Sequence, residues 1–256
     1  MRKAPVLHSS LLRPVDAAAQ AGAGQEAWPE RFASLAESAK DARLRAFYAA
    51  GTVSQETPLC DVPLMAMDVE TTGLDPVKDG IVSIGLVPMS LERIRTSASR
   101  HWILKPRVPL AAESVTIHGI TDSQVHSAPD LDAVLAEVLA TMAGHVLVVH
   151  CRDIERQFFN GALRTRIGES IEFPVIDTME LEARLHRRSQ RSWWDWALGR
   201  QPQRLSIRLA DSRRRYNLPR YQPHHALTDA LASAELLQAQ VAHRYSPETP
   251  VRDLWK

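Results

Sequence analysis

Hydrophobic and polar positions change their period partway along this chain. Three apolar segments separated by turn residues, 62–68, 81–88 and 96–104, predict an antiparallel meander of strands. Apolar positions then recur at helical spacing over 131–142, and the apolar segment 146–149 follows as a buried strand. Strand and helix alternate from there, with a helix over 153–166, a strand over 174–177 and helices after Thr178, near Ser206 and over 228–244. This order predicts an α/β fold with a mixed sheet flanked by helices.

The first sixty residues differ from the rest of the chain. Large apolar side chains are scarce at the start, and the segments 29–36 and 41–50 have the pattern of short amphipathic helices. We therefore expect an N-terminal helical extension over 1–60, partly flexible, a main domain over 61–245 and a C-terminal tail over 246–256. The extension could bind a protein partner, but packing on the main domain is the simpler interpretation.

Composition places the chain among soluble globular proteins. Of its 256 residues 45% are hydrophobic and 24% charged, enough to bury a substantial core without disulfides. The two cysteines, Cys60 and Cys151, have no second Cys or His at zinc-like spacing, which favours a reducing compartment. No apolar run approaches the roughly 20 residues that span a bilayer. These features predict a cytoplasmic protein.

A net charge of +1 hides one strongly basic segment. Residues 184–220 contain eleven Arg against two Asp, together with Trp193, Trp194 and Trp196. Such a mixture suits single-stranded nucleic acid, because guanidinium groups pair with phosphates and aromatic rings stack on bases. It also suits a solvated helix and a loop that Trp side chains pin to the core, so the sequence leaves these interpretations open.

Two acidic residues end the first predicted strand. Asp68 and Glu70 are two residues apart, so a strand directs both carboxylates to one face. Neighbouring carboxylates repel unless a cation lies between them, and Mg²⁺ or Mn²⁺ prefers such oxygen ligands. A strand end that becomes polar at the solvent would also explain the pair. The Thr-Thr-Gly-Leu sequence that follows favours the metal site.

A second cluster precedes the last predicted helix. In the sequence His-His-Ala-Leu-Thr-Asp, Asp229 lies at the helix start and His224 in the loop before it. Asp229 could simply cap the helix or stabilise its dipole. A histidine beside a metal-bound water can instead accept a proton near neutral pH, and carboxylates that hold divalent ions neutralise a phosphoryl group. These are the residue types that phosphodiester hydrolysis requires.

A third cluster follows the predicted strand over 146–149. Asp153 and Glu155 both lie near the start of the next helix, and a separation of two residues rotates them by about 200° around it. Only one of them can therefore face the same site. The spacing alone leaves both candidates open.

At these three clusters the sequence resembles the DEDDh 3′-to-5′ exonucleases, the superfamily of the epsilon proofreading subunit of DNA polymerase III and of RNase T. The resemblance covers about residues 62–242. Its first motif, Asp-x-Glu-Thr-Thr-Gly-Leu, is complete at 68–74, and His-x-Ala-x-x-Asp-Ala is complete at 224–230. Ile-His-Gly-Ile-Thr at 117–121 and Ile-Asp-Thr at 176–178 match elements between them. In the middle motif, aligned on His150, Glu155 replaces the usual Asp.

The resemblance implies an RNase H-like fold with a five-stranded mixed sheet, and a 3′-to-5′ exonuclease that releases nucleoside monophosphates from single-stranded DNA or from RNA. The implied ligands of two Mg²⁺ or Mn²⁺ ions are Asp68, Glu70, Glu155 and Asp229, and the implied general base is His224. The implied contacts to the terminal nucleotide at the nucleic acid 3′ end are Thr71, Thr72 and Leu74, although this segment could also be only a turn. The alternative is a catalytically weak nucleic-acid-binding, proofreading or scaffold subunit, because a Glu is longer than the usual Asp.

Overall fold

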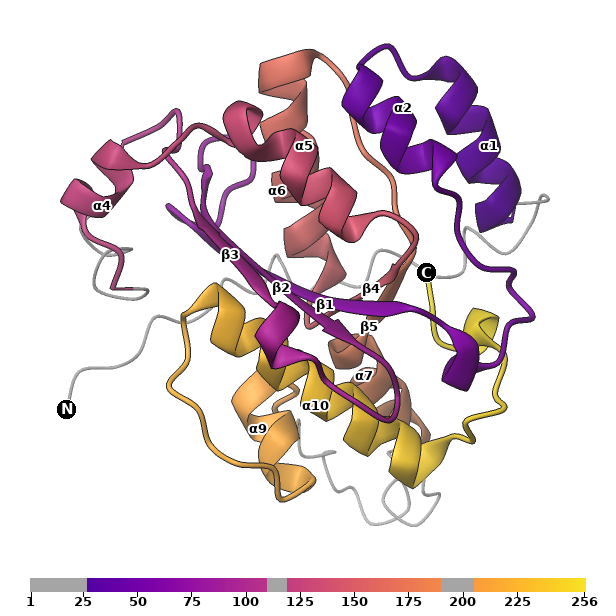
Figure 1. Ribbon diagram of the computed structural model, residues 1–256. Coiled ribbons are helices and arrows are strands. Elements are labelled where there is room, and N and C mark those ends of the chain that lie inside the picture. Colours follow the sequence, from indigo (N-terminus) through magenta and orange to yellow (C-terminus); the bar gives the residue numbers. More distant parts are fainter. Residues whose placement is uncertain (1–26, 110–118, 190–204) are drawn as a thin grey trace, which may run out of the picture.

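The computed structural model describes residues 27–109, 119–189 and 205–256, which form a five-stranded sheet between two layers of helices (Figure 1). The strands are β1 (Leu64–Thr71), β2 (Ile81–Met89), β3 (Arg100–Ile103), β4 (Val146–Val149) and β5 (Val175–Asp177). Their order is β3-β2-β1-β4-β5. Strands β3, β2 and β1 pair antiparallel, and β1, β4 and β5 pair parallel. The predicted mixed sheet, a meander followed by parallel strands, is confirmed.

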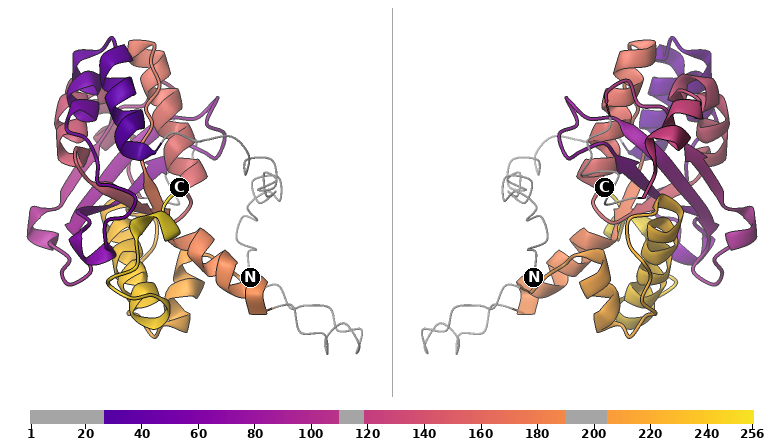
Figure 2. Two further views of the ribbon diagram at one scale, coloured as in Figure 1. Left: turned by 90° about the vertical axis from the view of Figure 1, so that its right-hand side faces the viewer. Right: turned by 90° about the vertical axis from the view of Figure 1, so that its left-hand side faces the viewer.

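Each face of the sheet is covered by its own helices. The helices of the first face are α1 (Trp28–Ser38), α2 (Ala42–Ala49), α5 (Leu131–Met142) and α6 (Arg152–Ile167). The helices of the second are α7 (Thr178–Ser189), α9 (Leu209–Arg215) and α10 (Ala226–Arg244). Figure 2 shows the two layers from the sides, with the indigo α1 and α2 opposite the yellow α10. Because side chains alternate along a strand, β1 supplies Met65 and Met67 to the first core and Leu64 and Ala66 to the second.

Three elements differ from the sequence-based expectation. Strand β3 begins only at Arg100, because residues 96–98 form a 3₁₀ turn, η2 (Thr96–Ala98). Helix α4 (Asp122–Ser127) was not expected, since six residues are too few for a helical period. It is stabilised by a capping box, in which Thr121 and Gln124 each accept a hydrogen bond from the backbone of the other. Helix α10 begins two residues earlier than expected, at Ala226.

The described part of the N-terminal extension shares the core of the main domain. Phe32, Phe47 and Tyr48 are 1–3% exposed and belong to the same apolar cluster as the side chains of α5 and α6. The Glu169 carboxylate accepts hydrogen bonds from the backbone N–H groups of residues 40 and 41, at 2.9 and 2.6 Å. Helices α1 and α2 are therefore joined to the domain by apolar contacts and by hydrogen bonds.

This packing predicts a large stability loss when Phe32 is truncated. Phe32→Ala is expected to lower the free energy of unfolding by about 3–5 kcal/mol, because it opens a cavity beneath α1 and α2. Urea unfolding followed by circular dichroism measures the change. Glu30→Ala, on the exposed side of α1, is the matched control. An equal effect of the two substitutions would show that α1 does not belong to the folding unit.

The segment over 246–256, expected as a tail, packs against the second core. It contains the 3₁₀ turn η3 (Val251–Asp253), and both Val251 and Leu254 are buried. Backbone hydrogen bonds of 3.2 and 2.8 Å join Val175 and Lys256 in both directions, so the edge of β5 is paired. Over the described residues, no helix is both long and apolar enough to cross a membrane.

Candidate active site

Three carboxylates meet where α10 begins beside β1. Asp68, Glu70 and Asp229, named here the acidic cluster, each place a carboxylate oxygen within 4.8 Å of the others. Asp68 and Glu70 lie on the sheet face that α10 covers, as the alternation along β1 predicts. The approach of α10 requires Gly85, which lies opposite Asp68 on β2, because a Cβ at Gly85 would collide with the backbone of Ala226.

The loop before α10 places His224 next to the acidic cluster. The backbone N–H of His224 donates a hydrogen bond of 2.7 Å to Oδ2 of Asp229. His224 has a φ of 69°, in the left-handed region that is costly for a residue with a side chain. Its imidazole is exposed. The structure thus brings together Asp68, Glu70, Asp229 and His224, four of the residues that the sequence singled out.

The acidic cluster is electrostatically unfavourable when all its carboxylates are charged. Burial, followed by repulsion from Glu70, Asp229 and Glu155, holds the pKa of Asp68 well above its usual range. Burial and the charge of Asp229 raise the pKa of Glu70 to about 8. Burial also raises the pKa of Asp229, against the opposing effect of hydrogen bonds from the His224 and His225 backbones. Hard divalent cations prefer ligand sets that consist only of oxygen, so the residues present fit Mg²⁺ or Mn²⁺.

Glu155 and Asp153, the two acids of the third motif, point in different directions. Glu155 on α6 is 3% exposed, and burial holds its pKa well above the usual range. Its charge contributes to the raised pKa of Asp68, and the charges of Asp177 and Asp153 contribute to its own, so Glu155 lies within electrostatic reach of both groups of acids. Its buried Oε2 has no hydrogen-bond partner among the described residues, a costly arrangement that a metal ligand role would relieve. The Asp153 side chain, in contrast, is 64% exposed.

Glu155 does not belong to the group of oxygens that meet within 4.8 Å, so any contact with the same ions would lie at the edge of the acidic cluster. Its role as the fourth ligand stays a prediction.

The three expected substrate contacts differ in how they are held. The hydroxyl of Thr72, 2% exposed, donates to Oδ1 of Asp79 and accepts from the N–H of Gly80, both at 3.0 Å. The Thr71 hydroxyl donates to the Gly73 carbonyl at 2.6 Å. Leu74, in contrast, is 52% exposed. Of the three side chains, only Leu74 is therefore exposed, whereas the hydroxyls of Thr71 and Thr72 form hydrogen bonds within the loop.

Asp79 is a residue of this loop that sequence reasoning missed. Its Oδ2 also accepts from the N–H of Asp75 at 2.9 Å, so one carboxylate joins both sides of the loop. A Cβ at Gly73 would overlap this carboxylate, which explains the glycine of the first motif. The sequence predicts only turn residues between the segments 62–68 and 81–88, because the partners of Asp79 depend on how the loop closes.

Much of the described basic segment is occupied in internal ion pairs. Arg213 pairs with Glu235 at 2.6 Å, and Arg215 pairs with Glu182 at 2.7 Å. Burial alone would raise the pKa of Glu182, but hydrogen bonds, among them those from Arg215 and Tyr216, lower it. These pairs join α7, α9 and α10. Arg191 and the three Trp lie outside the described residues, as does His118.

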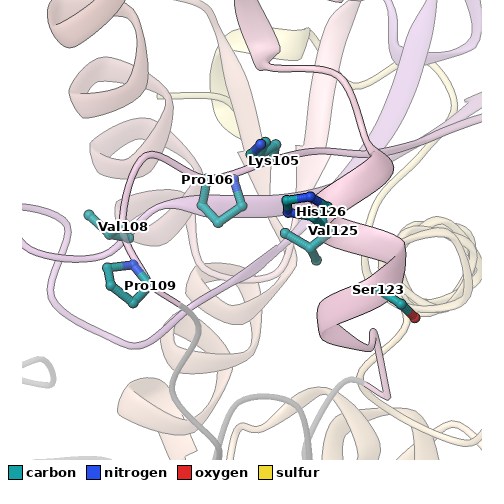
Figure 3. Close-up of a pocket in the computed structure, with 7 residues that line it drawn as sticks. All are labelled: Lys105, Pro106, Val108, Pro109, Ser123, Val125 and His126. Carbon is teal, nitrogen blue, oxygen red and sulfur yellow. The ribbon is translucent and has the colours of Figure 1, made fainter.

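A separate pocket of about 470 Å³ lies between the segment after β3 and α4 (Figure 3). It is lined by Lys105, Pro106, Val108, Pro109, Ser123, Val125 and His126. None of these residues belongs to the acidic cluster. A Cβ at Gly80 would lie 3.1 Å from Cβ of Pro106, so the pocket borders the end of the loop that Asp79 closes.

The raised pKa values predict how the stability of the metal-free protein depends on pH. The pKa of Glu70 is about 8 in the folded protein and 4.5 ordinarily, so between these values the folded state binds more protons than the unfolded state. The free energy of unfolding should therefore decrease as pH rises from about 5 to about 8, by an amount on the order of 4 kcal/mol.

Thermal unfolding in a chelator measures this dependence, and Mn²⁺ should restore more stability at high pH than at low pH. Glu70→Gln is the control and should make the dependence on pH shallower, with the remainder due to the raised pKa values of Asp68, Asp229 and Glu155. Stability that does not change across this window would contradict the electrostatic description of the cluster.

Comparison with known proteins points to one group of enzymes. A family model described as an exonuclease of the RNase T type matches residues 65–237. The DNA polymerase III PolC-type protein of Halalkalibacterium halodurans is 30% identical over 185 residues, which cover 72% of this chain and 12% of that protein. The DNA polymerase III subunit epsilon-like protein of Rhodobacter capsulatus is 30% identical over 181 residues, which cover 70% of this chain and 24% of that protein. The chain therefore spans only a small part of these relatives.

Solved structures share the fold. The nuclease domain of 3′hExo, a DEDDh family member bound to rAMP, is similar with a TM-score of 0.58 and 16% identity, covering 71% of this chain and 92% of that one. Exonuclease X in complex with 5′ overhanging duplex DNA is similar with a TM-score of 0.54 and 21% identity, covering 73% of this chain and 96% of that one.

Proposed function

Because the chain belongs to the RNase T family of exonucleases, within the DEDDh superfamily, we propose that it is a metal-dependent 3′-to-5′ exonuclease acting on nucleic acid. The observation that carries this proposal is the acidic cluster, in which one carboxylate oxygen of each residue lies within 4.8 Å of the others. The backbone N–H of His224 donates a hydrogen bond to one of these carboxylates, that of Asp229. Phosphodiester hydrolysis needs charge neutralisation and a proton acceptor at one place, and this arrangement supplies the residues for both.

Each residue then has a defined task. Asp68, Glu70 and Asp229 would hold two Mg²⁺ or Mn²⁺ ions together with Glu155, and these ions would neutralise the charge on the phosphoryl oxygens. His224 accepts the proton of the attacking water at its exposed imidazole, and Asp229 fixes the backbone of His224 through the 2.7 Å hydrogen bond. The product is a nucleoside monophosphate.

The substrate end of the site lies at the loop after β1. Leu74 presents an exposed apolar side chain, which can pack against the terminal nucleobase without reading its identity. Thr71 and Thr72 contribute through the backbone of this loop, because their hydroxyls are bonded inside it. We propose single-stranded DNA as the main substrate, since the relatives are named as DNA polymerase III proteins, and RNA as the second.

An oligonucleotide panel tests this function. Single-stranded DNA, duplex DNA and short RNA, each labelled at the 5′ end, are incubated with Mg²⁺, Mn²⁺ or a chelator. A ladder that shortens one nucleotide at a time from the 3′ end, only with metal, is the expected result. An oligonucleotide whose 3′ end is blocked by a phosphorothioate linkage is the control and should resist. Products that do not depend on metal, or internal cuts, would contradict the proposal.

One observation favours a second function, a catalytically weak nucleic-acid-binding or proofreading subunit. Glu155 occupies the position of the usual Asp and lies outside the group of oxygens within 4.8 Å, so the fourth ligand could hold metal weakly. Binding of the same oligonucleotides without any shortening would support this alternative. Docking of a protein partner through α1 and α2 has less support, because their apolar side chains face the core.

A further inference from the structure

Two histidine rings contact each other at a tilt outside the acidic cluster, beside the start of α10. The ring centroids of His101 on β3 and His225 lie 4.8 Å apart, with 38° between the ring planes. His225 is the residue that precedes the first turn of α10, and it directly follows His224. The edge strand of the sheet therefore contacts the loop that carries the proposed general base.

The register of the sheet explains this contact. Asp68, Gly85 and His101 lie opposite one another on β1, β2 and β3, so all three belong to the same sheet face. Gly85, in the middle, has no side chain, and the backbone of residues 226 and 227 takes that space. Helix α10 thus begins between Asp68 on one side and His101 on the other.

His101 is itself anchored to the sheet. A hydrogen bond of 2.7 Å joins its Nε2 to Oγ of Ser83, which is 1% exposed and lies opposite Glu70. Partial burial and the neighbouring His225 lower the pKa of His101, which favours its neutral ring beside a second histidine. The His101 ring, which contacts His225, is therefore hydrogen-bonded to the residue opposite Glu70, a proposed metal ligand.

His224 needs such support because its own restraints are few. Its side chain is exposed and its φ of 69° is unfavourable. The side chain of His225 caps no backbone N–H of α10 and reaches the helix only through a long hydrogen bond of 3.4 Å between Nδ1 and the Thr228 hydroxyl. Asp229 holds only the backbone of this loop, through hydrogen bonds from the N–H groups of His224 and His225. The contact of the His225 ring with the His101 ring adds a restraint on the side chain of the next residue.

We propose that His101 is a positioning residue, which holds the backbone of His224 in place through the contact of its ring with the ring of His225. The proposal rests on the proposed exonuclease function. His101 acts through His225, and its removal should leave substrate binding intact while the imidazole of His224 is aligned less often. A misplacement of about 1 Å can cost a factor on the order of 100 in rate, so a partial loss of order should cost less.

Steady-state kinetics on a single-stranded oligonucleotide test the proposal. His101→Ala should lower kcat about 10-fold with KM changed less than about 2-fold, and His101→Phe, which keeps a stacking ring, should recover most of this loss. Arg100→Ala, an exposed neighbour on the same strand, is the control and should equal wild type. In a His224→Ala background, His101→Ala should have no further effect, because the base it positions is absent.

Amide hydrogen exchange separates this proposal from the exonuclease function itself. The His224 amide should exchange about 10-fold faster in His101→Ala than in wild type, at an unchanged Tm, whether or not the protein cleaves nucleic acid. A wild-type protein without activity would contradict the proposed exonuclease function. The exchange rate of the His224 amide would still show whether His101 restrains this loop. Unchanged exchange, an unchanged kcat, or an equal loss in the His224→Ala background would each overturn the role of His101.

Discussion

Asp68→Asn is expected to abolish most of the catalytic activity and to stabilise the metal-free protein at the same time. The substitution keeps the shape of the side chain but removes one carboxylate of the acidic cluster. Loss of a metal ligand removes several kcal/mol of transition-state stabilisation, which corresponds to a decrease in kcat on the order of 10³-fold. The same change removes the cost of burying an ionisable carboxyl beside other carboxylates, which is the cost that raises the pKa of Asp68. The metal-free Tm should therefore rise.

Two measurements check the expected loss of activity and the expected gain in metal-free stability. Hydrolysis of a single-stranded oligonucleotide gives kcat, and thermal unfolding with and without Mn²⁺ gives the stability and its dependence on metal. Asp61→Asn, an exposed acid just before β1, is the matched control and should leave both unchanged. Activity above about one tenth of wild type would contradict the role of Asp68. A lower metal-free Tm would contradict the electrostatic argument even if activity is lost.

The sequence predicted the parts of the site that depend on local geometry. The alternation of β1 alone places Asp68 and Glu70 on one face, and the structure has them there. That Asp229 would join them could be inferred only from the resemblance, since it requires α10 to cross β2 at Gly85. No pattern along the chain signals that contact, because it depends on packing between elements that are more than 130 residues apart in the sequence.

The number of charged residues in a segment predicted less about the structure than the spacing of apolar residues did. The excess of arginine over 184–220 left phosphate contacts and a solvated helix open, and of these arginines the structure pairs Arg213 and Arg215 with Glu235 and Glu182 inside the molecule. A count of charges cannot tell which of them have partners across the fold. The contact of His101 with His225 was missed for a similar reason, because one residue lies on the edge strand β3 and the other in the loop before α10.

Glu155→Ala is expected to lower kcat on the order of 10²-fold, whereas Asp153→Ala should change it less than about 3-fold. The two acids are close in sequence, but Glu155 is 3% exposed and its charge acts on Asp68, whereas the Asp153 side chain is 64% exposed. Asp153→Ala is thus the natural control for Glu155→Ala. The reverse result, a loss with Asp153→Ala alone, would show that Asp153 is the fourth ligand.

The substitution Glu155→Asp tests whether the length of the Glu155 side chain is needed for metal binding and catalysis. If Glu155 reaches the ions from the edge of the cluster, the shorter Asp should fail to reach them, and kcat should fall at least 10-fold with a higher Mn²⁺ requirement. If α6 instead lies close enough for an Asp, the variant should be more active than wild type, and the glutamate would be what weakens the enzyme. Titration of activity with Mn²⁺ for both proteins separates these outcomes, because a ligand that no longer reaches the metal raises the concentration needed for half activity.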